Sequence, residues 1–293
     1  MASHRGIWTF ASGGAWDLDD RTRLVGILNV TPDSFSDGGR YLDTGAAIAR
    51  GLLMAEEGAD AIDVGGESTR PGSLPVPDEE QIRRVVPVIR ALRAQIDRAC
   101  ERIRISADTS RSAVAAAAID AGADIVNDVT GLKGDPAMAP LLARTGAAAI
   151  LMHMRGTPRT MQEDPRYEDL MGEITSALRG AWSRAREAGI RDDRIVLDPG
   201  IGFGKTTDHN LEILARLAEL ASLGRPLLVG VSRKSFLGNV TGLPVDQRLE
   251  AGLAAAAAAI LNGAALVRIH DVAPTSSMVR VLDAIRAAGG TGR

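Results

Sequence analysis

The sequence predicts an α/β protein that folds as a single (β/α)8 barrel, also called a TIM barrel. Its length of 293 residues is close to the ~250 residues typical of that fold. Short apolar runs that end in a polar residue recur about eight times along the chain. Helical patterns separate these runs, and strands that alternate with helices pair in parallel.

Four of the predicted strands share one local pattern, in which a Gly-Ala pair precedes an apolar run with a polar tip. The pairs begin at Gly58, Gly122, Gly146 and Gly263, and the runs are residues 62–64, 125–127, 150–153 and 266–270. Each glycine fits the position after a helix end, where φ is positive. Each run fits a strand that is buried on both faces, as in a parallel sheet.

Four further strands are predicted at residues 24–28, 104–107, 194–197 and 226–229. A helix is predicted between two strands by apolar residues that recur at three- and four-residue steps. These residues are Ile82, Val85, Val86, Ile89, Leu92 and Ile96. The alanine-rich residues 251–261 are fewer than the ~20 that a membrane-spanning helix needs. They predict a buried helix packed tightly against the sheet.

An open doubly wound sheet is the alternative architecture. Such a sheet usually has a glycine-rich first turn that opens a helix. Residues 202–205, Gly-Phe-Gly-Lys, are too short for a dinucleotide fingerprint or a Walker A loop. We see no linker rich in Pro, Gly or Ser, so we expect a short arm over residues 1–22 and one barrel domain over residues 23–293.

The composition argues against several kinds of partner. The chain has 34 Lys and Arg against 37 Asp and Glu, a formal net charge of −3, so no general field attracts nucleic acid or an anionic membrane. The single cysteine, Cys100, cannot form an internal disulfide, and no apolar run typical of a signal peptide occurs in the first thirty residues. We therefore expect a cytoplasmic protein that holds any anionic ligand by local groups.

Catalytic groups in a (β/α)8 barrel lie at the carboxyl ends of the strands, so the polar tips are the candidate site. In chain order the tips are Asn29, Asp63, Asp108, Asn127, His153, Asp198, Ser232 to Lys234, Arg268 and His270. Asp108, Asn127 and Asp198 can accept hydrogen bonds from a flat heterocycle that presents NH and NH2 groups. Each could instead cap the following helix, but three at one rim favour a site.

Basic side chains gather at the same rim. Arg268 and His270 lie two residues apart on the last strand, so their side chains point the same way, and a cation pair there suggests an anionic ligand. Arg70, in the loop of residues 65–72, would add bidentate recognition of a phosphate or carboxylate. The alternative is that these cations form salt bridges to nearby acids, namely Asp63, Glu67 or Asp271.

Aromatic and histidine side chains add less specific signals. Phe35, Phe203 and Phe236 follow strands, where an aromatic ring can stack on a flat substrate, although packing over the barrel is the better interpretation for Phe236. Phe35 lies in a polar, glycine-ended segment typical of a mobile lid. His153 and His209 are expected to be structural. No histidine pair has metal-ligand spacing, so a zinc site is not expected, whereas Mg²⁺ held by one protein oxygen and by phosphate oxygens fits.

The polar strand ends lie within two long motifs and several short ones. Residues 26–39 read Gly-Ile-Leu-Asn-Val-Thr-Pro-Asp-Ser-Phe-Ser-Asp-Gly-Gly, and residues 63–72 read Asp-Val-Gly-Gly-Glu-Ser-Thr-Arg-Pro-Gly. Short motifs follow in order at residues 108–110, 127–128, 151–154, 197–200, 232–235 and 268–271. Together these motifs closely resemble the signatures of the dihydropteroate synthase family. Ile201 and Arg111 depart from the usual residues, and neither change removes a group that the reaction needs.

The resemblance implies an enzyme of folate biosynthesis that joins p-aminobenzoate to 6-hydroxymethyl-7,8-dihydropterin pyrophosphate, giving 7,8-dihydropteroate and pyrophosphate. It implies pterin contacts from Asp108, Asn127, Asp198 and Lys234, pyrophosphate contacts from Thr69, Arg268 and His270, and Mg²⁺ on Asn29. The implied p-aminobenzoate pocket, where sulfonamides would compete, consists of Phe35, Arg70, Pro71, Phe203 and Ser232. The family also suggests a homodimer.

Two other functions remain open from the sequence. A related barrel binds folate for methyl transfer to a corrinoid protein, but it has no use for pyrophosphate, and residues 29–39 and 232–234 argue against it. A catalytically silent paralogue would keep the barrel as a binding module. The implied site is intact, and its polar groups would be costly to keep unpaired without a ligand.

Overall fold

Eight parallel strands alternate with helices in the computed structural model, which describes residues 6–31, 44–68, 72–98, 103–157 and 159–290. The strands are β3 (Arg23–Asn29), β4 (Ala61–Gly65), β5 (Arg104–Asp108), β6 (Ile125–Asp128), β7 (Ala148–Met152), β8 (Ile195–Asp198), β9 (Leu228–Gly230) and β10 (Leu266–Ile269). They follow the order β8-β7-β6-β5-β4-β3-β10-β9, and a parallel bridge between Leu197 and Leu227 joins the two ends. The predicted (β/α)8 barrel is confirmed.

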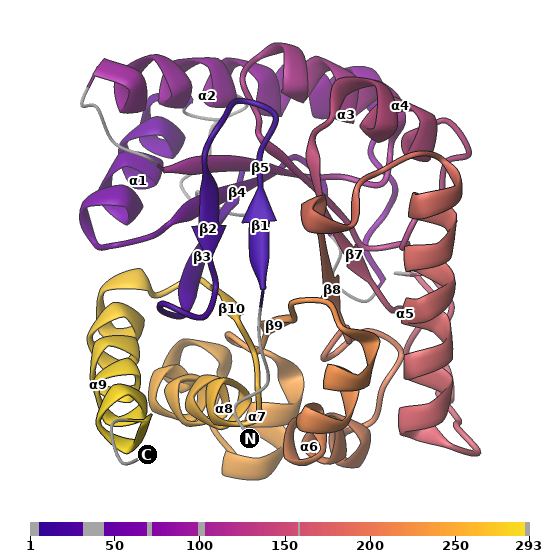
Figure 1. Ribbon diagram of the computed structural model, residues 1–293, viewed down its shortest axis with the longest axis vertical. Helices are drawn as coiled ribbons and strands as arrows, with labels where there is room; N and C mark the ends of the chain where they lie inside the picture. Colours follow the sequence, from indigo (N-terminus) through magenta and orange to yellow (C-terminus); the bar gives the residue numbers. More distant parts are fainter. Residues whose placement is uncertain (1–5, 32–43, 69–71, 99–102, 158, 291–293) are drawn as a thin grey trace.

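Helices surround the strands (Figure 1). They are α1 (Thr44–Glu56), α2 (Asp78–Arg98), α3 (Ser112–Asp120), α4 (Met138–Thr145), α5 (Leu170–Glu187), α6 (Thr207–Ala215), α7 (Ser235–Thr241), α8 (Leu249–Leu261) and α9 (Val272–Gly290). Among the described residues, short 3-10 helices also occur: η2 (Asp192–Arg194), η3 (Leu217–Leu223) and η4 (Val245–Gln247). Each strand is therefore followed by covering helical structure, which leaves the strand ends to form the two openings of the barrel.

The glycines of the repeated Gly-Ala pairs have the backbone conformation that was predicted for them. Gly58, Gly122, Gly146 and Gly263 have φ values of 103°, 110°, 70° and 108°. Side-chain-bearing residues rarely adopt these angles, whereas glycine does so without steric cost. Each glycine thus turns the chain from a helix into the following strand.

The predicted apolar face of α2 is confirmed, whereas the prediction for α8 holds on one face alone. Val85, Ile89 and Leu92 of α2 are buried. In α8, Ala256, Ala259 and Ile260 are buried, but Leu261 is 61% exposed. An apolar sequence does not show which of its faces a neighbour covers, because every face of such a helix could be buried.

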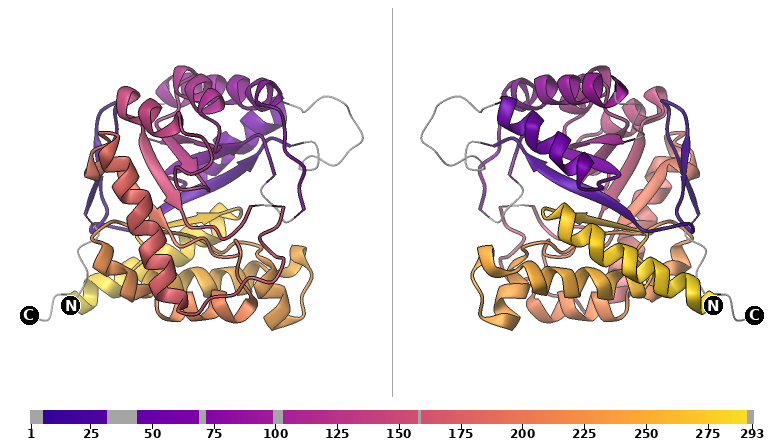
Figure 2. Two further views of the ribbon diagram at one scale, coloured as in Figure 1. Left: turned by 90° about the vertical axis from the view of Figure 1, so that its right-hand side faces the viewer. Right: turned by 90° about the vertical axis from the view of Figure 1, so that its left-hand side faces the viewer.

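The arm before the barrel forms a hairpin that the sequence did not predict. Strands β1 (Ile7–Thr9) and β2 (Ala15–Asp17) pair antiparallel, with Trp8 opposite Trp16. Trp8, Phe10, Trp16 and Leu18 are buried in one cluster with barrel residues such as Val25 and Leu266. Figure 1 shows the hairpin across the strands, and Figure 2 shows it at one end of the barrel. The hairpin therefore covers the amino-terminal opening.

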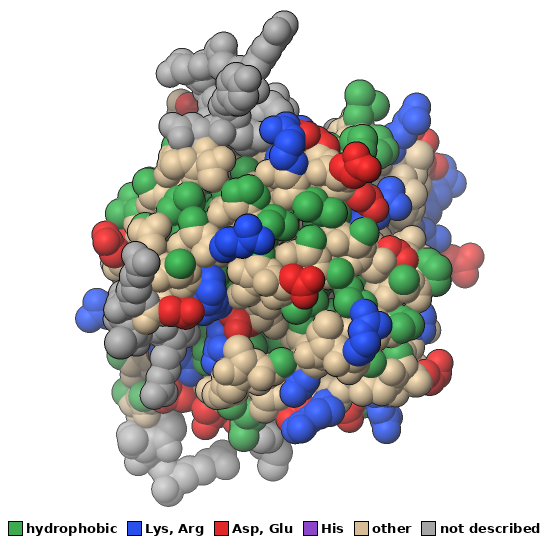
Figure 3. Space-filling view, turned by 90° about the horizontal axis from the view of Figure 1, so that it is seen from above, with side chains coloured by type: hydrophobic (Ala, Val, Ile, Leu, Met, Phe, Trp, Pro, Cys, Tyr) green, Lys and Arg blue, Asp and Glu red, His purple; other side chains and the backbone are tan. Residues whose placement is uncertain are grey.

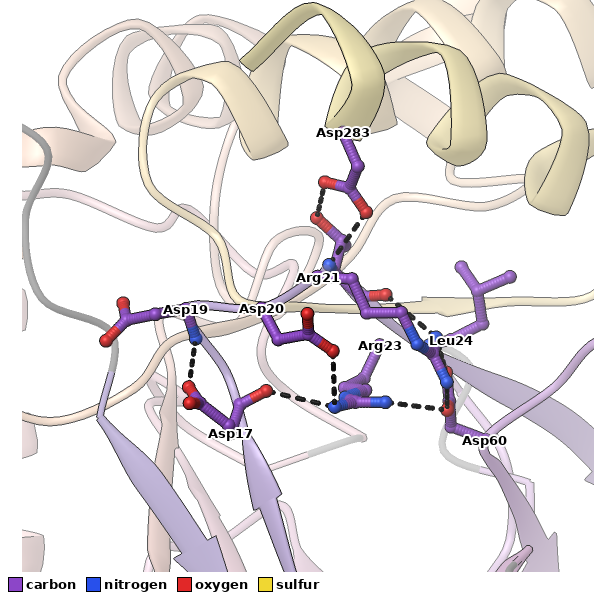
Figure 4. Close-up of polar contacts among 9 residues, drawn as sticks. Asp17, Asp19, Asp20, Arg21, Arg23, Leu24, Asp60 and Asp283 are labelled. Carbon is purple, nitrogen blue, oxygen red and sulfur yellow. Dashed lines mark hydrogen bonds and ion pairs between the residues drawn. The ribbon is translucent and has the colours of Figure 1, made fainter. Parts of the chain in front are cut away.

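Polar contacts fasten the segment after this hairpin to the barrel (Figure 4). Asp60, just before β4, accepts hydrogen bonds from Arg21 Nη1 and from the Leu24 backbone N–H, both at 2.9 Å. Arg23 Nη2 donates to the Asp17 carbonyl at 2.9 Å. The Thr22 N–H donates to Asp283 of α9 at 2.9 Å. The amino-terminal end of the barrel is thus covered by the hairpin and held by hydrogen bonds, which leaves the carboxyl end open for a functional site.

The surface carries charges of both signs. On the face seen in Figure 3, basic and acidic side chains lie interspersed among apolar ones, in keeping with the small net charge of −3. In the part of the chain that the structure describes, no helix has the length and apolar character needed to cross a membrane.

Candidate active site

Strand register places several predicted site residues at one level of the barrel. Asn29 lies opposite Gly65, Gly65 opposite Asp108, and Asp108 opposite Asn127 on successive strands β3 to β6. Side chains of neighbouring residues in register point to the same face of a sheet. These groups therefore share one face at the carboxyl ends of the strands, as the sequence predicted.

Arg268 is the centre of a buried polar network inside the barrel. Its Nε donates to Asp63 Oδ2 at 2.6 Å, and its Nη2 donates to Asp108 Oδ2 at 2.6 Å. Asn127 Nδ2 also donates to Asp63 Oδ2, at 3.0 Å. The salt bridge to Asp63 that the sequence offered as an alternative is therefore present, and it joins residues predicted to bind pterin and pyrophosphate.

Asp63 has a larger part in the site than the sequence indicated, where it was one of three possible salt-bridge partners. It is fully buried in β4, and its Oδ2 accepts the hydrogen bonds from both Asn127 and Arg268. Within the described ranges, its Oδ1 has no hydrogen-bond partner, and neither has the hydroxyl of Ser106, its neighbour in register on β5. A carboxylate between Ile62 and Val64 was the available signal, because an acidic residue in a buried strand needs a partner.

Asp198 ends β8 and is 5% exposed. Its Oδ1 accepts a hydrogen bond from the Gly200 backbone N–H at 2.7 Å, so this carboxylate also stabilises the following turn. Burial raises the pKa of Asp198 to about 6, although the Gly200 hydrogen bond and the charges of Lys234, Arg268 and Lys205 oppose that rise. Asp198 is therefore ionised at neutral pH and protonated in moderately acidic solution.

The pKa of Asp198 predicts that ligand affinity falls at acidic pH, giving an acid limb in the pH profile of binding. Because only the ionised carboxylate can accept two hydrogen bonds from an NH and an NH2 group, affinity for a bare pterin should fall as pH drops below about 6. The limiting slope is about tenfold per pH unit for one required ionisation. Calorimetric titrations between about pH 5 and 8 would measure it. An identical acid limb in Asp198→Asn would assign the titration to another group.

Lys234 and Phe203 bring two predicted pockets into contact. The Lys234 Nζ lies 4.0 Å from the centroid of the Phe203 ring, within the range of a cation–π interaction. Phe203 is 8% exposed and packs with Val129 and Met152. Burial and the nearby charge of Arg268 lower the pKa of Lys234 to about 8. The predicted pterin residue and the predicted p-aminobenzoate residue are therefore direct neighbours.

His270 and Ser232 also lie together at the rim. The Ser232 hydroxyl accepts a hydrogen bond from the His270 backbone N–H at 3.2 Å and lies 3.0 Å from its Nδ1. Burial, followed by the charges of Arg233 and Arg268, lowers the pKa of His270 to about 3. The expected cation pair is therefore wrong: His270 is a neutral hydrogen-bonding ring, kept neutral by burial and by nearby cations that include Arg268.

The space above Gly65 is lined by two side-chain oxygens. A Cβ at this position would lie 3.6 Å from Asp108 Oδ2 and 3.8 Å from Asn29 Oδ1. Oxygens of this type suit Mg²⁺. Among the described residues, no cluster of three His, Cys, Asp or Glu could bind a metal. The residues present therefore fit a Mg²⁺ ion that takes most of its ligands from a phosphate group and water.

Other predicted residues divide into three groups. Phe35, Thr69, Arg70 and Pro71 lie outside the described residues. Phe236 is 2% exposed and packs in the core, as expected. His209 is structural, as expected, because it shares two hydrogen bonds of 3.2 Å with Thr206 at the start of α6. His153 contacts Lys205, a residue that the sequence analysis did not assign.

Comparisons with known proteins agree on one family. The family model described as "Pterin binding enzyme" matches residues 25–270. A dihydropteroate synthase of Escherichia coli K12 is 43% identical over 279 residues, which are 95% of this chain and 96% of that protein.

Solved structures give the same result. A Yersinia pestis dihydropteroate synthase with a sulfonamide drug complex has a TM-score of 0.89 and 41% identity, covering 96% of this chain and 100% of that one. A Xanthomonas albilineans dihydropteroate synthase with 4-aminobenzoic acid has a TM-score of 0.87 and 44% identity, covering 94% and 97%. The similarity thus extends over nearly the whole of each chain.

Proposed function

The chain belongs to the dihydropteroate synthases of the pterin-binding enzyme family, and we propose that the rim of buried polar groups described above carries its reaction. That reaction, in folate biosynthesis, joins 6-hydroxymethyl-7,8-dihydropterin pyrophosphate to p-aminobenzoate and releases pyrophosphate. The observation that supports this site most directly is the set of buried acceptors on β5, β6 and β8, next to two cations.

The pterin ring is assigned to Asp108, Asn127, Asp198 and Lys234. The ring edge presents NH and NH2 donors, and Asp198 offers a carboxylate that is ionised at neutral pH. A site built to accept hydrogen bonds discriminates strongly against molecules that lack the donors, because its buried acceptors would then stay unpaired. This acceptor set therefore favours a pterin over an apolar ring of equal size.

The pyrophosphate is assigned to Arg268 and His270, with Thr69 from outside the described residues. A guanidinium carries five N–H donors, and the bonds to Asp63 and Asp108 use two of them. The remaining donors can bind phosphate oxygens while the two carboxylates hold the side chain in place. Neutral His270 adds a hydrogen bond and no charge.

Mg²⁺ is assigned to Asn29, because its amide oxygen and the Asp108 carboxylate both face the space above Gly65. When bound, the ion would neutralise charge on the pyrophosphate and so make it a better leaving group. Asn29 would orient the phosphate end of the substrate, and Asp108 would link that end to the pterin contacts.

We place p-aminobenzoate beside Phe203 and Ser232, with Phe35, Arg70 and Pro71 completing the pocket. Phe203 lies against Lys234, so a ring stacked there would be close to the bound pterin. Holding both substrates at the reacting carbon converts an encounter in solution into a local step. The same pocket would bind sulfonamides in competition with p-aminobenzoate.

The reaction is a dissociative displacement at the exocyclic methylene carbon of the pterin. The C–O bond to pyrophosphate breaks, and its electron pair leaves with the pyrophosphate towards Arg268. Positive charge then develops on the pterin, where the carboxylates of Asp198 and Asp108 stabilise it. The amine nitrogen of p-aminobenzoate forms the new C–N bond and loses a proton, and no covalent bond to the enzyme forms.

One assay tests this function against its alternatives. The purified protein is incubated with the pterin pyrophosphate, p-aminobenzoate and Mg²⁺, and dihydropteroate and pyrophosphate are measured. Equal amounts of both products support the proposal. Tight binding of both substrates without product would indicate a silent paralogue. Binding of a methylated folate, without response to the pyrophosphate substrate, would indicate a methyltransferase.

The assembly that we propose is a homodimer in the cytoplasm, a compartment that suits a chain with the single Cys100. Apolar side chains are exposed around α6, α7 and α8, and these helices contact one another. The exposed apolar side chains are Leu211 (42% exposed), Val240 (59%), Leu243 (38%), Val245 (52%), Leu249 (37%) and Leu261 (61%). Clustered exposed apolar residues favour an interface, so we assign this surface to the second copy.

Sedimentation velocity tests the dimer. The wild type should sediment as a dimer at micromolar concentration, whereas Leu261→Arg should shift it towards the monomer, because a charge buried without a partner at an interface is costly. Leu53→Arg on the exposed side of α1 is the matched control and should leave the dimer intact. A monomeric wild type would contradict the proposal.

A further inference from the structure

Lys205 is an unusually buried lysine at the edge of the candidate site. Only three of the 34 basic residues in the chain are lysines, namely Lys133, Lys205 and Lys234. Lys133 is exposed and Lys234 is partly buried, whereas Lys205 is 2% exposed. A buried ammonium group is costly unless it is held by hydrogen bonds. Its contacts therefore indicate what the group does.

The side-chain amine of Lys205, whose pKa burial lowers to about 7 against the opposing charge of Asp198, is held by two acceptors on different segments. It donates to the Phe203 carbonyl at 3.0 Å and lies 2.9 Å from His153 Nδ1. Burial and the charge of Lys205 lower the pKa of His153 to about 3, so the ring is neutral. A neutral ring that accepts at Nδ1 can donate at Nε2, and His153 also has a hydrogen bond to the Pro199 backbone.

These contacts span the loop of residues 199–204, which follows Asp198. His153 connects the loop at Pro199, and Lys205 connects it at Phe203. Between the two, Gly200 packs so closely that a Cβ there would overlap the His153 carbonyl oxygen. The loop thus packs directly on the segment after β7. A substitution of Lys205 would therefore first change the position of Phe203, whose carbonyl accepts its hydrogen bond.

The position of Phe203 matters because its ring contacts the Lys234 ammonium, 4.0 Å from the ring centroid. The carbonyl of the same residue is the acceptor for Lys205. Lys205 therefore holds the backbone of Phe203 in place, and Lys234 lies over the face of the Phe203 ring. Cation–π contacts depend on the cation lying over that face.

We propose that Lys205 is a positioning residue that, together with His153, fixes the Phe203 ring beside Lys234 and thereby determines affinity for the arylamine substrate. Lys205 acts through Phe203 and touches neither substrate. This inference rests on the proposed function, since it takes Phe203 as part of the p-aminobenzoate pocket.

Steady-state kinetics of Lys205→Met test the proposal, with each substrate varied in turn. Methionine keeps an unbranched side chain and removes the ammonium group. Measured below about pH 7, where Lys205 is charged, the KM for p-aminobenzoate should rise about tenfold or more, the size of one lost hydrogen bond to a charged group. The KM for the pterin pyrophosphate should rise less, by under about threefold, because the lost Lys205 charge affects that substrate only by raising the pKa of Asp198. Lys133→Met, the same change at an exposed lysine, is the control and should match the wild type.

A double-mutant cycle tests whether the effect passes through Phe203. Once Phe203→Ala has removed the ring, adding Lys205→Met should raise the KM for p-aminobenzoate less than about twofold, because coupled residues are not additive. Independent, multiplicative effects would overturn the proposal, as would equal losses for both substrates. An absence of dihydropteroate from the wild type in the same assay would instead refute the proposed function.

Two substitutions of His153 keep the proposal testable if Lys205→Met does not fold. The amide oxygen of asparagine can occupy the position of Nδ1, whereas that of glutamine reaches the position of Nε2. His153→Asn should therefore preserve an acceptor for Lys205 and remain near the wild-type KM for p-aminobenzoate. His153→Gln removes that acceptor and should raise this KM selectively. The opposite order, or no difference between the two, would contradict the proposal.

Discussion

Asp198→Asn should remove most of the activity while leaving the protein folded. The carboxylate is 5% exposed, so a ligand donor that loses its acceptor there has no water to replace it. Asparagine puts an NH2 donor where the pterin also presents donors. The loss in binding should be at least about 1–3 kcal/mol, and the loss in kcat/KM should be larger, because the charge also stabilises the developing pterin cation.

Thermal stability should not fall in this variant. The hydrogen bond from the Gly200 N–H can be kept by the asparagine Oδ1. The folded-state pKa of Asp198 is raised to about 6, so its contribution to stability is full below about pH 4 and is lost as the pH rises through 6. At neutral pH the wild type therefore carries a buried charge that the variant lacks.

Calorimetry and steady-state kinetics should thus show a wild-type or higher Tm with weak pterin binding. A much lower Tm with normal pterin affinity would mean that Asp198 is a structural cap. Asp192→Asn, at the short helix before β8, is a matched control away from the carboxyl-terminal rim and should change neither the pterin affinity nor the turnover.

Arg268→Ala should reduce both stability and substrate binding. The substitution leaves Asp63, which is fully buried, and Asp108 without their shared partner. Breaking a buried ion pair in this way typically costs about 3–5 kcal/mol. Separately, the loss of a charged hydrogen bond to phosphate should weaken binding of the pterin pyrophosphate by about 1.5–3 kcal/mol more than binding of the bare pterin alcohol.

The two effects can be separated by experiment. Arg268→Ala combined with Asp63→Asn removes one of the stranded charges and should recover part of the unfolding free energy without recovering pyrophosphate binding. Burial raises the pKa of Asp108 even with Arg268 present, so lowering the pH should also stabilise the single variant relative to the wild type. Denaturant unfolding and calorimetry with both pterins measure these quantities. An equal affinity loss for the two pterins would show that Arg268 does not contact the phosphates.

Most of the barrel could be predicted from local sequence patterns. Gly58, Gly122, Gly146 and Gly263 were placed after helix ends, and all four have positive φ. The residues at the ends of β5, β6 and β8 were expected at one rim because carboxyl ends of parallel strands meet at the same edge. The hairpin of β1 and β2 was missed, since its buried tryptophans are stabilised by contacts with distant barrel strands.

The site was harder to predict where its chemistry depends on distant partners. Arg268 and Asp63 are 205 positions apart, and sequence alone offered three acids as partners for the rim cations. His270 was expected to be charged, yet burial and neighbouring cations keep it neutral. Lys205 received no role, because its two acceptors are a backbone carbonyl and a histidine on another strand end.

Local sequence patterns thus predict the order of strands and helices, the glycine turns and the kind of polar group at each strand end. These features depend on backbone conformation and on side-chain periodicity, which act over a few residues. Tertiary structure alone decided which charges pair, which groups lose their water and therefore which protonation states the site holds. Ion pairing and desolvation depend on distance and burial in space, and Asp63, Arg268 and Asp108 come together only when the barrel closes.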